Sequence, residues 1–143
     1  MNRTETKNTV INFISRIWNE QKFEEIDNLL HVDFIDHSLP VSLPPNKDGL
    51  KRWISGTGQS FEHKTTIEEQ VTEGNKAIII IRMDLTHIGR WRDIEPTGIK
   101  VSAVGYRYFV MEEGKIKEHF GLIDGNAIEN QLRQAAAGCK IQE

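Results

Sequence analysis

The first third of the chain carries a helical pattern of apolar positions. From residue 6 to residue 19, apolar side chains recur at steps of three and four, which predicts a helix with one broad face packed against a larger body. A shorter helix is predicted over residues 22–30, and a third begins at Asn46 or Lys47 and ends near residues 56–58. Between them, residues 31–37 are predicted to be extended, and three prolines impose a loop. The prolines are Pro40, Pro44 and Pro45.

The period then changes from about four to two, which is typical of strands. Strands are predicted over residues 65–72, 77–87, 99–111 and 115–123, and a closing helix over residues 126–137. Gly74 and Gly114 fall in the tight turns between strands, where a positive φ is often needed. Helices followed by antiparallel strands predict an α+β fold, with three N-terminal helices on one face of a curved sheet and a short C-terminal helix. Both faces of the strands are partly apolar, so we expect a second copy to cover the outer one.

The last strand ends in a carboxylate. With a strict period of two, Ile116, Phe120, Leu122 and Asp124 share one face, interrupted only by Glu118. An aspartate at the end of an apolar row is costly to bury in its charged form, so its pKa would rise and it would become a usable proton carrier. The alternative is that Asp124 simply caps the closing helix. The pattern alone does not decide between them.

Composition narrows the class of protein. The chain has 143 residues, a net charge of -3 and one cysteine, Cys139. We expect a single domain over residues 1–143, in the cytoplasm, without an internal disulfide. The acidic balance gives no support for a nucleic-acid partner, and no apolar run is long enough to span a membrane.

Several segments resemble a known family in their order and spacing. They are Thr86-His87-Ile88-Gly89, residues 96–101 (PTGIKV), residues 114–120 (GKIKEHF) with Asp124 and Gln131-Leu132, and residues 34–37 (FIDH). Together they resemble the SnoaL-like polyketide cyclase family of the nuclear-transport-factor-like, or ketosteroid-isomerase-like, superfamily. The similarity covers roughly residues 10–132. Leu85 and Phe120 depart from the family, in which glycine and tryptophan are common at these positions.

The resemblance implies a cone of curved sheet and helices that encloses one apolar pocket, usually in a homodimer. In the cyclases an aspartate at the end of the last strand is the general acid/base of an intramolecular aldol ring closure, and Asp124 matches its position. The chemistry that the resemblance implies needs no metal and no other cofactor.

Other side chains can assist such a reaction. His37 is placed by the resemblance at the pocket mouth, and His87 has the parity of the inward residues of its strand; each can equally be a structural histidine. His119 has the opposite parity to Asp124 and is predicted to face outward. Tyr106 or Tyr108 can donate to an enolate oxygen or simply cover the sheet. Trp18, Trp53, Tyr106 and Phe120 are the candidate substrate-binding residues.

A metal site is a weak alternative. His31, Asp33, Asp36 and His37 offer ligand atoms, but they are too crowded in one extended segment to converge on an ion. Cys139 has no base nearby in the sequence and is not expected to be a nucleophile.

Three functional hypotheses follow. The first is an enzyme of lyase or isomerase type that acts on an apolar carbonyl compound by acid–base chemistry at Asp124. The second is a module that binds the same kind of ligand without chemistry. The third is a structural dimer whose pocket is filled by its own side chains. The substrate itself is not predicted.

Overall fold

The computed structural model describes residues 2–142, and it describes side chains as far as Ala137. Cys139 therefore lies outside the residues whose side chains are described. None of the described helices is both long enough and apolar enough to cross a membrane.

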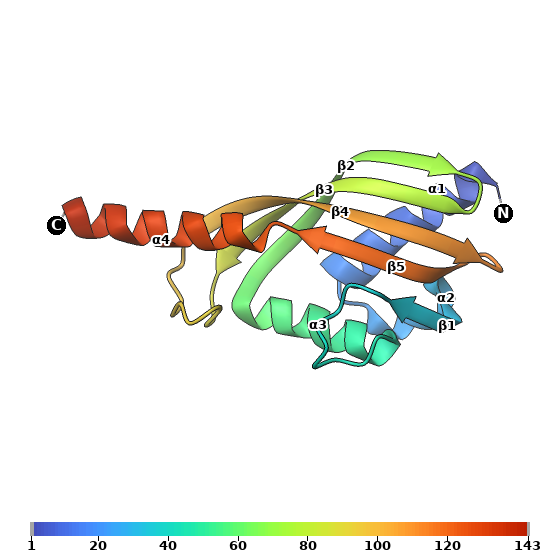
Figure 1. Cartoon of the computed structure of the whole chain (residues 1–143), viewed down its shortest axis with the longest axis horizontal. Coiled ribbons are helices and arrows are strands. Elements are labelled where there is room, and N and C mark those ends of the chain that lie inside the picture. Colours follow the sequence, from blue (N-terminus) through green and yellow to red (C-terminus); the bar gives the residue numbers. More distant parts are fainter. Residues whose placement is uncertain (1, 143) are drawn as a thin grey trace.

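Five strands form one curved sheet in the order β1-β5-β4-β3-β2 (Figure 1). The four long strands are antiparallel neighbours joined by hairpins or by the 88–99 loop, whereas the short first strand runs parallel to the last. The predicted sheet was purely antiparallel, so this edge strand is an addition to it. The strands are β1 Leu30–Asp36, β2 Phe61–Glu73, β3 Lys76–His87, β4 Lys100–Glu112 and β5 Lys115–Ile123.

The helices that precede β2 gather on one side of the sheet (Figure 1). Their apolar faces and the inner face of the sheet enclose one buried core, as the helical and alternating patterns predicted. The α+β fold class is thereby confirmed. These helices are α1 Arg3–Asn12, the π-helical turn η1 Phe13–Asn19, the 3-10 turn η2 Phe23–Glu25, α2 Ile26–Leu29 and α3 Lys47–Ser60.

Two helices differ from their predicted form. The C-terminal helix α4 (Gly125–Gln142) is 18 residues long rather than short, and it extends past the end of the sheet (Figure 1). Helix α3 runs on through Gly56 and Gly58 because glycine weakens a helix without forbidding it. Trp53 on α3 is 43% exposed rather than fully inward.

A β-bulge in β5 changes which of its residues face the core. Met111 pairs with Ile116, but the next residue of β4, Val110, pairs with Glu118, so Lys117 is an extra residue. After a bulge the alternation resumes with opposite parity. Ile116 and His119 are therefore buried.

This bulge overturns the orientation expected for the end of β5. Phe120, Leu122 and Asp124 are exposed, and His119 faces the core with an exposed fraction of only 1%. The expectation that Asp124 ends an inward apolar row, and that His119 faces outward, was wrong. The cause is one unpaired residue that a strict period of two does not include.

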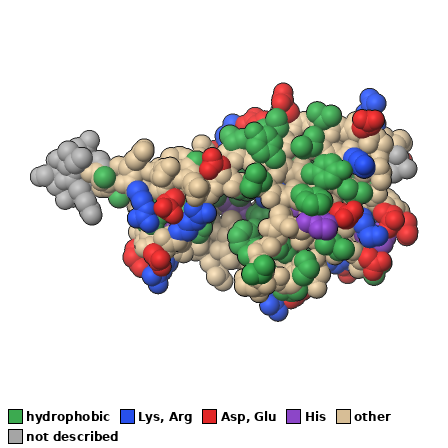
Figure 2. All heavy atoms as spheres, viewed as in Figure 1, with side chains coloured by type: hydrophobic (Ala, Val, Ile, Leu, Met, Phe, Trp, Pro, Cys, Tyr) green, Lys and Arg blue, Asp and Glu red, His purple; other side chains and the backbone are tan. Residues whose placement is uncertain are grey.

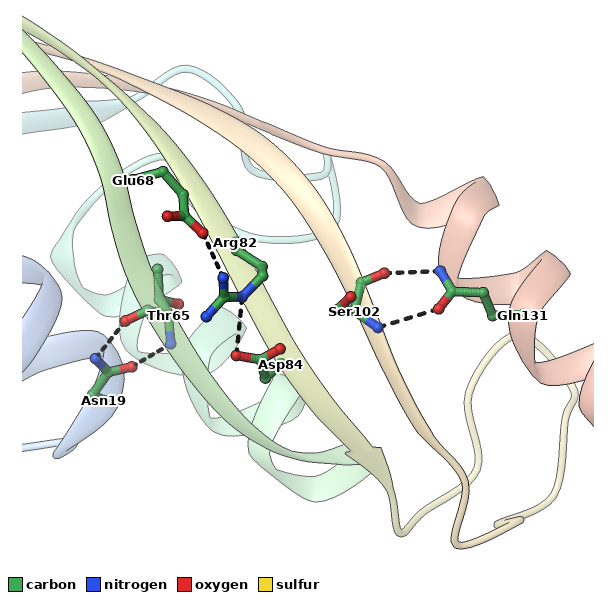
Figure 3. Close-up of polar contacts among 7 residues, drawn as sticks. All are labelled: Asn19, Thr65, Glu68, Arg82, Asp84, Ser102 and Gln131. Carbon is green, nitrogen blue, oxygen red and sulfur yellow. Dashed lines mark hydrogen bonds and ion pairs between the residues drawn. The ribbon is translucent and has the colours of Figure 1, made fainter.

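Two side-chain amides attach helices to strands by imitating a strand partner (Figure 3). Asn19 accepts from the backbone N–H of Thr65 at 2.8 Å and donates to its carbonyl at 2.9 Å. Gln131 does the same with Ser102, at 3.2 and 2.8 Å, and so holds α4 against β4. Each amide bonds both the backbone N–H and the C=O of one strand residue, so it fixes the orientation of the helix on the strand as well as its distance from it.

Candidate functional site

A cavity of about 230 Å³ lies between the inner face of the sheet, α3 and the start of α4. Its walls are mostly aromatic and aliphatic, which suits a small apolar ligand. Trp18 and Trp53, two of the residues predicted to bind substrate, both line it. The lining residues are Trp18, Trp53, Thr57, Phe61, Met83, Leu85, Trp91, Arg92, Arg107, Ile123, Gly125 and Ile128.

Arg107 is a buried charged residue of this wall, with an exposed fraction of 4%. Its guanidinium lies over the indole of Trp18, with 4.3 Å between Cζ and the ring centroid. Trp18 is presented by the π-helical turn η1, a form of helix often found at functional sites. Gly121 makes room for the arginine, since a Cβ at that position would lie 2.8 Å from Arg107 Nη1.

Behind Arg107 lies a buried Asp36–His119 pair. Arg107 Nη1 lies 3.3 Å from His119 Nε2, and His119 Nδ1 lies 2.9 Å from Asp36 Oδ2. An arginine can only donate, so Nε2 is the acceptor and the imidazole proton is on Nδ1, which donates to Asp36. Ser38 donates to the other oxygen of Asp36 through both its backbone N–H and its hydroxyl. His119 is thus a neutral imidazole held in one tautomer, with its lone pair toward Arg107.

Burial and neighbouring charges set the protonation states of the three residues. Burial, assisted by the charge of Arg107, lowers the pKa of His119 despite its bond to Asp36. Burial opposes ionisation of Asp36, but the hydrogen bonds from His119 and Ser38 outweigh it and hold its pKa below the ordinary value. Burial lowers the pKa of Arg107 to about 10, so it stays protonated near neutral pH. The cluster therefore holds one cation, one anion and one neutral base.

Several buried polar atoms near the cavity have no hydrogen-bond partner among the described residues. They include Arg107 Nε, Trp18 Nε1 and both ring nitrogens of His63, whose ring packs edge-on against Trp18. Burial lowers the pKa of His63. Since buried polar groups are nearly always satisfied, such a group of orphaned atoms indicates where a bound ligand or water supplies the missing partners.

A second arginine lines the cavity nearer the surface. Arg92 belongs to the 88–99 loop and has a positive φ of 46°, unusual for a residue with a side chain. Its guanidinium lies 4.6 Å from the Trp91 ring centroid and donates to Asn126 at the start of α4. The loop and α4 are thereby joined across one side of the cavity.

The structure places four predicted site residues away from this cavity. Asp124 is exposed and accepts from the backbone N–H of Ala127 at 3.0 Å, which is the N-cap geometry of α4. Tyr106 lines a groove with Asp124 on the outer face of the sheet. Phe120 is stacked at 4.3 Å on His37, which lies 2.9 Å from Glu118 on the same outer side. The expectation that Asp124 and His37 meet at the pocket is thus corrected.

His87 is buried at the end of β3, as its parity predicted, and its ring lies 5.4 Å from that of Phe61. Its Nδ1 accepts from the backbone N–H of Thr97 at 3.2 Å, which anchors the 88–99 loop. This contact is what we expect of a structural histidine, because His87 Nδ1 binds the backbone of the loop and does not face the cavity.

The four residues considered as metal ligands do not converge. Among the described residues, the side chains whose potential ligand atoms lie close together are His31, Glu112 and Glu113. His31 Nδ1 accepts from the backbone N–H of Asp33, so its proton is on Nε2, which lies 3.3 Å from a Glu112 oxygen. This tautomer offers no lone pair to an ion, so the geometry is that of a histidine–carboxylate contact.

The residues of the buried cluster were not selected from the sequence as site residues, yet one signal for them exists. Arg107 interrupts an alternating apolar row of β4 that contains Val101, Ala103, Phe109 and Met111. A charged residue on such a row is seldom buried without a purpose. His119 gives no comparable signal, because its inward position depends on the bulge.

Comparison with known proteins places the chain among small α+β proteins. The family model for "SnoaL-like polyketide cyclase" matches residues 8–132. No curated protein matches.

Several solved structures share the fold. TsrD from Streptomyces laurentii is 20% identical, with a TM-score of 0.81 and coverage of 92% of this chain and 97% of that one. A provisionally assigned polyketide cyclase from Bacillus cereus is 24% identical, with a TM-score of 0.78 and coverage of 90% and 80%. IdmH from Streptomyces antibioticus, also provisionally assigned as a polyketide cyclase, is 19% identical, with a TM-score of 0.80 and coverage of 89% and 97%. At these identities the similarity establishes the fold.

Proposed function

The chain belongs to the SnoaL-like polyketide cyclase family, and we propose from that premise that it is an acid–base enzyme acting on an apolar carbonyl compound. The observation that supports this most is the buried Arg107, which lines an apolar cavity and is backed by the oriented His119–Asp36 pair. In this proposal His119, rather than the helix cap Asp124, carries the proton.

The proposed steps use groups already in place. Arg107 turns from His119 Nε2 to the substrate carbonyl and donates to its oxygen. The freed Nε2 takes a proton from the carbon next to the carbonyl, which leaves an enolate whose oxygen Arg107 stabilises. The enolate carbon then attacks a second carbonyl, whose oxygen takes the proton from His119 Nε2, which gives a ring closure. Alternatively, a conjugated enolate takes that proton at a different carbon, which gives an isomerisation. Asp36 keeps the imidazole in the required tautomer and stabilises the imidazolium.

The magnitudes of such effects are known in general. A positioned base contributes about 10²–10⁴-fold. A preorganised donor to a developing oxyanion contributes about 10²–10³-fold. Both should therefore be measurable in single variants, without knowledge of the natural substrate.

The test is exchange of the α-hydrogens of 2-tetralone, a bicyclic enolisable ketone, followed by NMR in heavy water. We expect the wild-type protein to accelerate exchange, and His119→Asn and Arg107→Met each to lose at least about 100-fold of that acceleration. Asparagine at position 119 keeps a donor for Asp36, and circular dichroism checks that each variant folds. Asp84→Asn, at an exposed position of β3, is the control and should leave the rate unchanged. Equal rates for wild type and His119→Asn would refute the proposed base.

A second candidate function is a ligand-binding protein without chemistry. It is favoured by two observations: Asp124 bonds a helix amide, and Arg107, which lines the cavity, contacts His119 Nε2. In that case the ketone would bind, detectable as a rise in melting temperature, while exchange remained at the rate of free solution.

The partner we propose for the outer face of the sheet is a second copy of the chain. Figure 2 shows hydrophobic side chains gathered over β4 and β5 on this face. Tyr106 lies opposite Leu122, and Tyr108 lies opposite Phe120, so the apolar side chains form one continuous surface. An apolar sheet face of this kind is typical of protein interfaces.

A further inference from the structure

The charged side chains on the wall of the cavity favour an anion. The lining residues, all within the described part of the chain, include two arginines, Arg92 and Arg107, and no acidic residue. Arg92 lies 3.6 Å from Glu129, outside the lining. The nearest charge acting on Arg107 is Asp36, which it reaches only through the neutral His119. Arg107 Nε has no hydrogen-bond partner among the described residues.

We propose that this cavity binds an aromatic carboxylate, and that His119 takes up one proton when the anion binds to Arg107. This goes beyond the proposed function and rests on that cavity being the ligand site. Because the acid occupies Arg107 and protonates His119, it is a ligand that competes with the proposed reaction rather than its substrate. The aromatic part is indicated by the walls, where Trp18, Trp53, Phe61 and Trp91 present flat apolar surfaces.

The proton follows from charge balance in a buried site. Without ligand, Asp36, His119 and Arg107 sum to zero charge. A bound carboxylate would leave one negative charge in a place shielded from water, which is costly. Protonation of His119 restores neutrality, and Nε2 is free to accept the proton because Arg107 has moved its donor to the carboxylate.

The surroundings of His119 allow this change. The charged or titratable groups that face it are Asp36 from β1, Arg107 from β4 and, more distantly, His37 after β1. The rings of Phe13 and Phe109 complete the enclosure. Arg107 is the neighbour whose charge most opposes protonation of His119, and it is the one that the anion would neutralise.

The experiment is calorimetric titration with naphthoate and with the matched neutral ligand naphthamide, near neutral pH, in two buffers that differ in ionisation enthalpy. For the wild-type protein we expect naphthoate to bind at least about tenfold more tightly than naphthamide, with uptake of close to one proton. Arg107→Met should abolish the preference. His119→Asn should keep the preference for the anion and lose the proton uptake. Arg52→Met, an exposed arginine on α3, is the control and should change neither.

Equal affinities of the acid and the amide, or binding of the acid without proton uptake, would overturn the inference. If Arg107→Met does not fold, the acid–amide comparison and His119→Asn still decide it. The proposed function fails separately: a protein that exchanges the hydrogens of tetralone but does not prefer the acid retains the enzyme and loses only the anionic ligand. If neither ligand binds, the cavity is not the ligand site and both proposals fall.

Discussion

At the scale of single residues, the site depends on histidines kept neutral by burial. His119 is oriented by Asp36, whereas in the described part of the chain neither ring nitrogen of His63 has a hydrogen-bond partner. Burial lowers the pKa of both side chains, so each is harder to protonate in the folded than in the unfolded protein. Folding is therefore linked to pH through both rings.

The sign of that link gives a prediction for His63. Because its folded pKa is lowered, the unfolded chain binds the proton first as the pH falls below about 6.5, and stability decreases from there downward. Each such group contributes at most about 1.4 kcal/mol per pH unit. We expect His63→Phe, which keeps an aromatic ring against Trp18 but cannot titrate, to lose less stability between pH of about 7 and about 5 than the wild type.

Urea unfolding at a series of pH values measures this difference. The control is Asn130→Ala, at an exposed position of α4, which changes no titratable group and should keep the slope of the wild type. Parallel curves for His63→Phe and the wild-type protein would show that His63 does not titrate with unfolding in this range.

At the scale of elements, a single bulge decides which face of β5 carries the chemistry. The strand itself, its hairpin at Gly114 and its end before α4 follow from apolar alternation and turn residues. The position of Lys117 as an unpaired residue could not be predicted in this way. A bulge is a property of the register between two strands and cannot be seen in the alternation of one strand. For this reason the fold could be predicted well from the sequence, whereas the residues at the end of β5 were assigned to the wrong faces of the sheet.

The cavity likewise contains residues that local sequence predicts and contacts that only the assembled sheet creates. Trp18 was recognised as a cavity wall because its helical stripe is apolar, and helical spacing is local information. The contact between Arg107, His119 and Asp36 joins residues from three strands, and it exists only once the sheet has curved. Asp36 and His119 were therefore visible in the sequence as residues but not as a pair.

The exposed position of Asp124 gives a prediction at this scale. It caps α4, so Asp124→Ala should lower the free energy of unfolding by about 1 kcal/mol, and it should leave the exchange of tetralone unchanged. Urea denaturation and the exchange assay measure the two effects. Asn130→Ala, in the exposed middle of α4, is the control and should not be destabilising. A variant of Asp124 with full stability and no activity would return this carboxylate to the chemistry.

At the scale of the whole molecule, the two faces of the sheet have different roles. The inner face meets the helices and holds the cavity, while the outer face presents apolar side chains to solvent. Val104 is 51% exposed and Leu122 is 71% exposed there. Arg82 with Glu68 and Asp84 forms an ion-pair group near this apolar surface, in which the cation is satisfied within its own chain (Figure 3). Because Arg82 is already paired within its own chain, it would not leave an unpaired charge in an interface with a second copy.

The proposed dimer can be tested by placing charge on that face. Leu122→Lys replaces an apolar side chain that each copy would contribute, so an isologous interface receives the change twice. Burying a leucine stabilises by about 1.5–3 kcal/mol, and two lysines held close together repel each other in addition. We expect light scattering after gel filtration to give a dimer for the wild-type protein and a monomer for Leu122→Lys. Val41→Lys, in the fully exposed loop before α3, should remain dimeric. Since the cavity is built within one chain, the monomeric variant should still exchange tetralone, and loss of exchange on dissociation would instead mean that the second copy supports the site.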